Sequence, residues 1–354
     1  MKICIIGAGA MGCLYGARLR QVGFDVSMVD VWEEHVRAIN NSGLLLDGIG
    51  GEIRSHVKAT TDPSEIVGAD LVIVLVDANS TAAAGTAAAA ILAPDGFVLT
   101  LQNGIGNLDE LDRVLGRDRV MGGLSYHSAA LRGPGHATHT HAGPTWIGQR
   151  GGTLTGRLDL LAELFGRADL DPQIVDDIEL LIWEKWVLNS SVNAVCAITG
   201  LRQGEIPRTP PVEAFQDKLL EELFAVLAAK GIGLDPDAIR RKVKEQCWKK
   251  FNKPSMLQHV EAGKRTEIDA LNGAVAREGR ALGISTPYND ALALLVKGLE
   301  KARAQALHGP PIDYDHLEAE AARVARPEVP GVPSSGAASG GRAGRSRQPD
   351  CTLD

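Results

Sequence analysis

The sequence predicts an α/β domain with a parallel sheet, followed by an all-α domain. In the first half of its 354 residues, short apolar runs alternate with helical stretches, which is typical of a parallel sheet covered by helices. After about residue 170 strand patterns nearly vanish, and helical patterns continue to about residue 305. The length also favours two domains over one. We therefore expect an α/β domain over 1–170, an all-helical domain over 171–325 and a tail over 326–354.

Four apolar runs predict the strands of the first domain: KICIIG, DVSMVD, LVIVLV and FVLTLQN. Helices are expected between them, over roughly 10–22, 32–42 and 80–93. From Val120 to Ile147 the pattern changes, and a Gly-Pro-Gly turn at 133–135 predicts an antiparallel hairpin that closes the sheet. His139 and His141 would lie exposed on one face of this hairpin. Because no cysteine or carboxylate stands at ligand spacing beside them, we expect no metal.

Helical patterns in the second domain cover 178–199, 211–230, 236–250, 255–282 and 286–305. From Ala325 onward the chain is rich in Pro, Gly, Ser and Arg and has almost nothing to bury. Such a composition predicts a disordered tail.

Composition restricts the partners and the compartment. The net charge is -7 with a pI of about 5.8, and acidic and basic residues are mixed, which argues against nucleic acid or an anionic membrane as partner. No run approaches 18 apolar residues, and the N-terminus lacks a charged leader. The five cysteines are odd in number and lack paired spacing. We therefore expect a reduced, cytoplasmic protein that acts on a small molecule.

A glycine-rich segment follows the first strand and opens a helix, and in this context it predicts a Rossmann-type dinucleotide site. The first glycine allows a tight turn, the second lets a pyrophosphate approach the backbone, and the third lets the helix pack close to the strand. The phosphates would lie at the N-terminus of the helix. The segment consists of Gly7, Ala8, Gly9, Ala10, Met11 and Gly12.

Asp30 ends the second strand, 18 residues after Gly12. An acidic residue near this position hydrogen-bonds the hydroxyls of the adenosine ribose. The alternative is a turn aspartate at a strand end.

The run Ile182 to Val195, IWEKWVLNSSVNAV, is apolar but contains a lysine and two asparagines at intervals of four. On a helix, Lys185, Asn189 and Asn193 fall within roughly 80° of one another. Because apolar residues surround this polar stripe, we expect it to face a cavity. The alternative for Lys185 is a surface lysine that snorkels to water.

Further polar residues follow the strands and helices that surround this cavity. Asn103 follows FVLTL at the C-terminal end of the sheet, and NKPSMLQHVEAGKRTEID holds Asn252, Ser255 and Glu267 in or beside a helix. Together with the glycine loop, LQNGIG and WEKWVLNSSVNAVCAITG, these motifs resemble the ketopantoate reductase (2-dehydropantoate 2-reductase) family over about residues 1–305.

The resemblance implies reduction of the ketone of ketopantoate to (R)-pantoate, on the route to pantothenate and coenzyme A. It also implies that Lys185 is the general acid and that Glu267 contacts the substrate and sets the position and charge of the lysine. Asn103 would lie between nicotinamide and substrate. The remaining substrate-binding residues implied are Asn189, Asn193, Asn252 and Ser255. By the same likeness we expect a homodimer through the helical domain.

The chemistry agrees with these roles. Hydride addition to a ketone builds negative charge on oxygen, and a preorganised ammonium stabilises that charge and then supplies the proton. Lysine has a reference pKa near ~10.4, so burial that lowers it would ease proton transfer. The alternatives are a helix N-cap for Ser255 and an ordinary first-turn carboxylate for Glu267.

We predict NADH as the preferred cofactor over NADPH. Members of the family that use NADPH usually have a basic residue just beyond the second strand, where this chain has Val31 after Asp30. The family often has a lysine after the strand LVIVLV, where this chain has Asp77. In the substrate site, Gln203 stands where an asparagine is common.

Three other functions use parts of the same pattern. A reductase of another small branched or hydroxylated 2-oxo acid would keep the mechanism, since fold does not fix substrate. An opine-type dehydrogenase would require an amine for turnover. A non-catalytic dinucleotide sensor would have no need for the acid that Lys185 and Glu267 provide.

Overall fold

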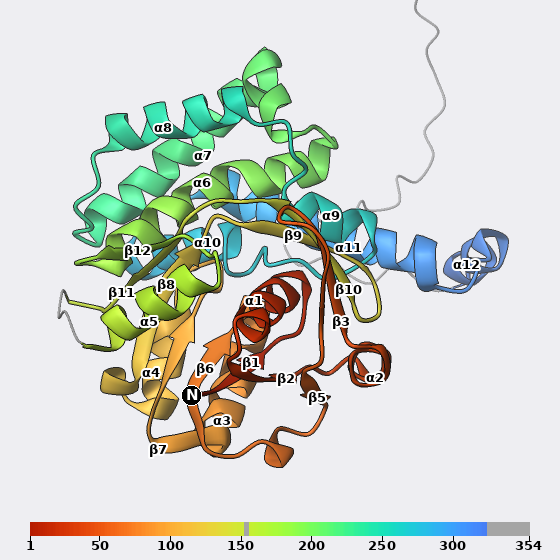
Figure 1. Ribbon diagram of the computed structural model, residues 1–354. Helices are drawn as coiled ribbons and strands as arrows, with labels where there is room; N and C mark the ends of the chain where they lie inside the picture. Colours follow the sequence, from red (N-terminus) through yellow and green to blue (C-terminus); the bar gives the residue numbers. More distant parts are fainter. Residues whose placement is uncertain (152–155, 324–354) are drawn as a thin grey trace, which may run out of the picture. The chain divides into compact units, whose positions relative to one another are not determined.

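The N-terminal half of the chain is built on an eight-stranded sheet (Figure 1). Its strands are β1 (Lys2–Ile6), β2 (Asp25–Val29), β5 (Lys58–Thr60), β6 (Ala69–Val74), β7 (Leu92–Thr100), β8 (Val120–Ser125), β11 (Thr145–Gly148) and β12 (Pro172–Val175). They lie in the order β12-β11-β8-β7-β6-β1-β2-β5. Every pair is parallel except β8 with β11. The central strands are buried on both faces, as their continuous apolar runs require.

The computed structural model describes residues 1–151 and 156–323. Helices cover both faces of the main sheet, and the core residues show how they divide. α1 (Ala10–Gln21) and α5 (Gly156–Arg167) contribute to one apolar cluster, and α3 (Thr81–Ile91) and α4 (Asn107–Leu115) to another. α2 (Glu33–Ser42) follows β2. The α/β fold is confirmed, with helices close to the predicted 10–22, 32–42 and 80–93.

A second sheet has the order β4-β3-β10-β9. It consists of β3 (Leu44–Gly48), β4 (Ile53–Ser55), β9 (Ser128–Gly133) and β10 (His136–His141). The Gly-Pro-Gly turn does join an antiparallel pair, but the prediction that this hairpin closes the main sheet is wrong. β10 pairs with β3 instead, and β11 and β12 extend the main sheet. The cause is a long-range pairing, in which Leu45 donates from its N–H to Gly135 O at 2.9 Å.

The prediction that His139 is exposed is also wrong, because its side chain is 2% exposed while His141 is exposed. His139 Nε2 lies 3.1 Å from Nδ1 of the buried His127. His127 comes from the segment after β8, so the pair joins the second sheet to the end of a main-sheet strand. Within the described residues, no group of three or more His, Cys, Asp or Glu side chains could hold a metal ion.

The C-terminal half is helical. Its elements are α6 (Ile178–Thr199), the 3-10 helix η4 (Gln203–Arg208), α7 (Pro210–Ala229), α8 (Pro236–Lys249), α9 (Ser255–Glu261), α10 (Asn272–Leu282) and α11 (Pro287–His308). The predicted single helix over 255–282 is wrong, because α9 ends at Glu261 and α10 begins at Asn272. Gly263, with a φ of +65°, turns the chain out of α9. The loop that follows carries Glu267.

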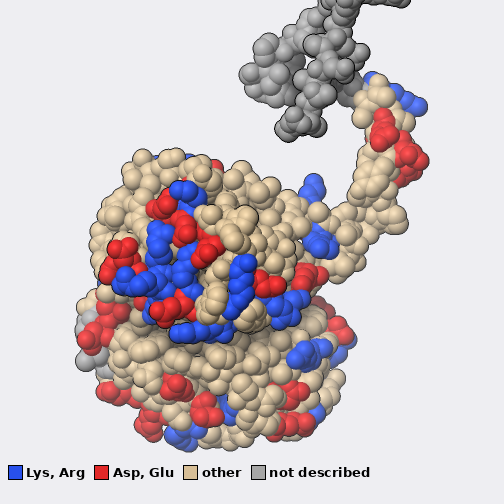
Figure 2. Space-filling view, turned by 90° about the horizontal axis from the view of Figure 1, so that it is seen from above, with Lys and Arg blue, Asp and Glu red and all other residues tan. Residues whose placement is uncertain are grey.

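Basic side chains on the surface of α8 form ion pairs with acidic side chains. Arg240 pairs with Asp217 of α7 at 2.8 Å, and Lys244 pairs with the same carboxylate at 3.1 Å. Figure 2 shows acidic and basic side chains interleaved on the face seen from above. This mixture agrees with the charge pattern of the sequence and presents no extended basic surface on that face.

Residues Met1–Gly309 form one compact unit, which contains both the sheets and the helices α6 to α11. The helix α12 (Tyr314–Ala321) lies outside it and was not predicted. The predicted disordered tail, 326–354, lies outside the described residues. Among the helices of the described chain, none has both the length and the apolar character needed to cross a membrane.

Candidate active site

The glycine loop has the geometry that its three predicted roles require. Gly7 has a φ of +99°, and a Cβ there would lie 2.8 Å from Leu75 C. A Cβ on Gly12 would collide with Gly7 O, so α1 packs against the strand only with glycine at this position. A Cβ on Gly9 would meet nothing within 4 Å. Gly9 therefore borders open space beside the start of α1.

The start of α1 leaves backbone donors available. Gly9 occupies the N-cap position of α1, and no side chain caps this end. The first N–H groups of a helix have no partner within the helix, so those of Ala10 and Met11 have none within α1. Such an end attracts a phosphate.

Asp30 lies between the glycine loop and α2. Its Oδ2 accepts a hydrogen bond from Ala8 N at 2.6 Å, and its Oδ1 accepts one from Trp32 N at 2.9 Å. Val31 is 93% exposed and supplies no cation. The first turn of α2 contains Glu33 and Glu34, so the surroundings of Asp30 are acidic.

Lys185 projects from the polar stripe of α6 and has a backbone partner. Its Nζ donates a hydrogen bond to Ser125 O, at the end of β8, at 2.9 Å. The ammonium also lies 5.4 Å from the centre of the Tyr126 ring. Burial lowers the pKa of Lys185 to about 8, and the nearby Glu267 carboxylate opposes that shift.

Glu267 reaches the same site from the loop between α9 and α10. Its Oε1 accepts a hydrogen bond from Ala78 N at 3.3 Å, and Asn103 also hydrogen-bonds to its carboxyl group. Burial raises the pKa of Glu267 to about 7, and the negative charge of Asp77 raises it further. The structure thus brings together Lys185, Glu267 and Asn103 from three distant segments.

The two asparagines of the stripe remain available to a ligand. Asn193 is 8% exposed and Asn189 is half-buried. Within residues 1–151 and 156–323, neither side-chain amide forms a hydrogen bond to protein. Neither amide is among the fully buried polar groups that lack a partner, so both reach solvent and are accessible to a polar ligand.

Asn252 and Ser255 lie at the α8–α9 connection and are exposed. No hydrogen bond in the described part of the chain joins their side chains to Lys185 or Glu267. Ser255 is the first residue of α9, but its hydroxyl does not cap the helix. The alternative role as an N-cap therefore finds no support.

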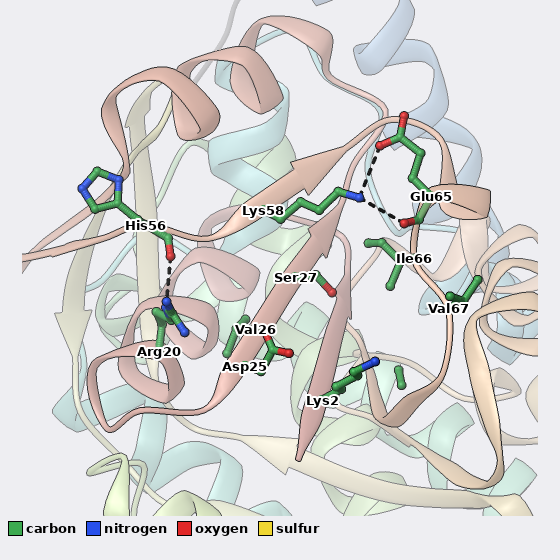
Figure 3. Close-up of a pocket in the computed structure, with 11 residues that line it drawn as sticks. Lys2, Arg20, Asp25, Val26, Ser27, His56, Lys58, Glu65, Ile66 and Val67 are labelled. Carbon is green, nitrogen blue, oxygen red and sulfur yellow. Dashed lines mark hydrogen bonds and ion pairs between the residues drawn. The ribbon is translucent and has the colours of Figure 1, made fainter.

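A hollow of the surface lies away from these residues. It has a volume of about 410 Å³ and lies at the N-terminal ends of β1 and β2, the edge opposite the glycine loop (Figure 3). Lys58 faces it and pairs with Glu65 at 3.6 Å, while Arg20 donates to His56 O. Ligands of open α/β sheets bind at the C-terminal ends of the strands, and none of the candidate residues lines this hollow.

Two sequence models of one family match the chain. The model described as ketopantoate reductase PanE/ApbA matches residues 3–152, and that of the C-terminal part of the same family matches residues 177–300. The chain belongs to this family. This membership confirms the predicted family, the predicted fold and the class of oxidoreductase.

Relatives and solved structures agree with the family. A 2-dehydropantoate 2-reductase of Archaeoglobus fulgidus is 34% identical over 300 residues, covering 84% of this chain and 98% of the relative. One of Pyrococcus horikoshii is 34% identical over 304 residues, covering 85% and 98%. The crystal structure of a PanE/ApbA family ketopantoate reductase from Ralstonia eutropha has a TM-score of 0.79 at 36% identity, covering 86% and 99%.

A D-mandelate dehydrogenase is similar in structure as well. Its ternary complex with NADH and anilino(oxo)acetate has a TM-score of 0.81 at 29% identity, covering 86% of this chain and 99% of that one. The likeness of fold thus extends to an enzyme named for a different acid.

Sequence reasoning missed part of the surroundings of Lys185. A cavity of about 10 Å³, the size of one water molecule, lies beside the lysine, and α8 forms one wall of it. Leu188, one of the apolar residues expected around the stripe, lines it together with residues that were missed: Tyr126, Glu184, Ile239, Lys242, Val243 and Gln246. Tyr126 directly follows a strand that ends at the site, and this position was the available signal.

His259 of α9 was also missed. It is half-buried, and burial lowers its pKa while the negative charge of Asp77 opposes the shift. Asp77 therefore acts on both Glu267 and His259. Its charge lies near Glu267 and His259, a location that the sequence prediction did not specify.

Proposed function

We propose that this chain reduces the ketone of 2-dehydropantoate to (R)-pantoate by hydride transfer from a nicotinamide cofactor, in pantothenate and coenzyme A biosynthesis. The observation that carries the proposal is the enclosed Lys185 ammonium beside Glu267, in a chain whose relatives are named 2-dehydropantoate 2-reductase. A Rossmann-type glycine loop in the same compact unit would bind the nicotinamide cofactor that the reaction needs.

In the proposed mechanism Lys185 is the general acid. A bound reduced nicotinamide would supply the hydride to the carbonyl carbon and become oxidised, while Lys185 Nζ would donate its proton to the oxygen that receives the C=O π electrons. Solvent then reprotonates the lysine. With a pKa of about 8, Lys185 is mostly protonated at neutral pH and is a stronger acid than an exposed lysine.

Glu267 supports this ammonium in two ways. Its negative charge favours the protonated lysine, and its hydrogen bonds to Ala78 N and Asn103 fix the carboxyl group. In the proposal Asn103 lies between nicotinamide and substrate. Asn189 and Asn193 bind the polar groups of the oxo acid, because their amides have no protein partner in the described chain. Asn252 and Ser255 complete the substrate site.

We assign the nicotinamide cofactor as NAD(H) in preference to NADP(H). The phosphates would lie at the glycine loop, which comprises Gly7, Ala8, Gly9, Ala10, Met11 and Gly12. Asp30 would accept hydrogen bonds from the ribose hydroxyls, and the adjacent Val31, Glu33 and Glu34 offer no cation for a 2′-phosphate. The similar D-mandelate dehydrogenase was crystallised with NADH, which is consistent with this assignment.

A second candidate substrate is another 2-oxo acid with a larger apolar side chain. It is favoured by the likeness to D-mandelate dehydrogenase and by the apolar side chains of Leu188, Ile239 and Val243 beside Lys185. The mechanism would be unchanged, because Lys185 acts on the 2-oxo group and not on the side chain.

A single assay tests the proposed function. Purified protein is mixed with NADH or NADPH and a panel of 2-oxo acids, including ketopantoate and phenylglyoxylate, with and without amines. The highest kcat/KM with ketopantoate, independent of amine, supports the proposal. Preference for phenylglyoxylate favours the second candidate, and a requirement for amine indicates an opine-type dehydrogenase. Binding of cofactor without turnover of any acid would indicate a sensor.

The proposal also includes the cytoplasm and a homodimer. The buried free thiols of Cys4, Cys13, Cys196 and Cys247 suit a reducing compartment. On α11, Leu294 and Leu295 are 64% and 60% exposed, and a second copy could cover them. Sedimentation velocity of the purified chain tests the dimer, and a monomer at micromolar concentration would refute it.

A further inference from the structure

The connection between α8 and α9 is fastened to η4 through its backbone. Arg202 Nη1 donates a hydrogen bond to Phe251 O at 3.0 Å, and Gln203 N donates to Asn252 O at 3.4 Å. Gly204 packs so closely here that a Cβ would lie 2.7 Å from Lys250 O. Residues 250–252 therefore follow η4 at contact distance.

Arg208, the last residue of η4, adds side-chain contacts at both ends of this segment. Its guanidinium carbon lies 3.8 Å from the centre of the Trp248 ring and 4.8 Å from that of Phe251. Its Nη1 also donates to Gly204 O at 2.6 Å and to Trp248 O at 3.4 Å. One guanidinium thus contacts the last turn of α8, the connection after it and η4 itself.

The two rings are unusually exposed for aromatic side chains. Trp248 is 54% exposed and Phe251 is 48% exposed, so apolar burial alone holds them weakly. A cation over an aromatic face supplies attraction that does not depend on burial. Arg208 therefore adds a contact that holds both rings against η4, beside the packing of the Phe251 ring on Gly204.

The polar side chains of the same segment remain free. The hydrogen bonds to η4 use the carbonyl groups of Trp248, Phe251 and Asn252, and not the Asn252 amide. In the part of the chain that the structure describes, the Asn252 amide and the Ser255 hydroxyl have no protein hydrogen-bond partner. A segment held by its backbone and its rings, with its polar side chains available, is preorganised to bind a ligand.

We propose that Arg208 is a positioning residue for the substrate, which holds Asn252 and Ser255 in their binding arrangement by fixing Trp248 and Phe251. This inference rests on the proposed function, since it takes Asn252 and Ser255 as substrate-binding residues. Arg208 touches neither the reacting atoms nor the cofactor in this scheme. Its loss therefore weakens substrate binding and leaves the chemical step and the cofactor site unaffected.

The test compares Arg208→Ala with Arg167→Ala. Arg167 is a matched control, because its guanidinium carbon lies 4.7 Å from the centre of the Phe24 ring and its Nη2 donates to Val22 O, far along the chain from the substrate segment. We expect Arg208→Ala to raise KM for ketopantoate about five- to tenfold, with kcat within about twofold of the parent and unchanged Kd for NADH. Arg208→Lys should restore part of the affinity, because it keeps a cation without the planar guanidinium.

A second variant shows whether Arg208 acts through the ring. Phe251→Leu should raise KM in the same direction, and the double variant Arg208→Ala, Phe251→Leu should raise it less than the product of the two single effects. Equal KM in Arg208→Ala and the parent, or a fall in kcat with unchanged KM, would overturn the inference.

Trypsin cleavage provides a readout that needs no substrate. Lys249 is the last residue of α8 and Lys250 begins the connection to α9. Mass spectrometry can follow cleavage after each. We expect faster cleavage there in Arg208→Ala than in the parent or Arg167→Ala, because cleavage reports local opening. Unchanged cleavage would refute the holding role. A parent enzyme that turned over no 2-oxo acid would refute the proposed function instead, and the cleavage rates would still test Arg208.

Discussion

The two ends of the candidate active site are constructed differently. At the glycine loop, backbone atoms make the structure: Gly7 N donates to Val29 O of the neighbouring strand at 2.8 Å, and Cys13 N donates to Gly9 O at 2.9 Å. At the catalytic end, side chains reach across the chain. Lys185 bonds to a carbonyl 60 residues away, and Glu267 accepts from an N–H 189 residues away.

The glycine loop thus contributes a backbone shape, and the other end contributes ionisable side chains. The glycine loop depends on the absence of side chains, so a substitution there acts through steric conflict. The catalytic end depends on two ionisable groups whose pKa values burial moves toward each other, Lys185 to about 8 and Glu267 to about 7. A substitution there should change the reaction while the fold persists.

The strongest test of the catalytic end is Lys185→Ala. We expect kcat to fall about 10²-fold or more, the usual scale for loss of a positioned general acid, with Kd for NADH unchanged. Lys301→Ala serves as control, because Lys301 is exposed on α11. An unchanged kcat in Lys185→Ala would refute the role of the lysine.

Two neighbouring glycines test the other end. Gly12→Ala places a Cβ against Gly7 O, so we expect it to lower the free energy of unfolding by about 1–3 kcal/mol. Gly9→Ala meets open space, so stability should change by less than about 0.5 kcal/mol, while Kd for NADH rises about tenfold because the methyl group occupies the proposed pyrophosphate position. Thermal denaturation and cofactor titration distinguish the two variants. Equal stability and equal Kd for both would contradict the steric account of the loop.

The adenosine end can be tested by charge. A 2′-phosphate next to Asp30 would place like charges together, which costs roughly 4 kcal/mol at 4 Å and an effective dielectric near 20, before screening. If only about a quarter of that cost remains, NADH is favoured roughly fivefold. We expect the parent to prefer NADH, and Asp30→Ala combined with Val31→Arg to shift kcat/KM toward NADPH. Preference for NADPH in the parent would show that other residues read the adenosine ribose.

The smallest expected effect is a shift in a pH profile. Because Lys185 must be protonated to donate, kcat/KM for reduction should fall as pH rises through about 8. The Glu267 carboxylate raises the pKa of Lys185, so Glu267→Gln removes that influence and should move the falling limb to lower pH. Rates at constant ionic strength between pH 6 and 10 test this. A limb that moved to higher pH, or did not move, would argue against the coupling of the two groups.

The same contrast decides how much could be predicted from sequence. Apolar runs placed the four predicted strands, which are β1, β2, β6 and β7, and the glycine motif after the first of them identified the loop, because each of these signals lies in residues close in the chain. The partner of Lys185 could not be predicted in this way, since a backbone carbonyl carries no signature in the sequence. Glu267 and the asparagines were assigned through the family resemblance, and their roles stay predictions.

The errors have the same origin. The Gly-Pro-Gly hairpin was recognised, but its pairing with β3 is set by residues about 90 positions earlier, as His136 against Leu45 shows. His139 is buried because His127 and the second sheet cover it, which the alternating pattern of one strand does not reveal. The break between α9 and α10 follows from the site itself, where Glu267 turns toward Ala78 and Trp186 Nε1 donates to Ala270 O at 3.0 Å.

The long reach of Glu267 also has a consequence for synthesis on the ribosome. All eight strands of the main sheet lie within the first 175 residues, whereas Glu267 comes about 90 residues later. At about 5–20 residues per second, that interval lasts roughly 5 to 20 s. During this interval the nascent chain has its complete glycine loop but no Glu267. The apolar face of α6 is then not yet covered by the helices that follow it in the chain. That exposed face is where we expect a chaperone to engage the growing chain.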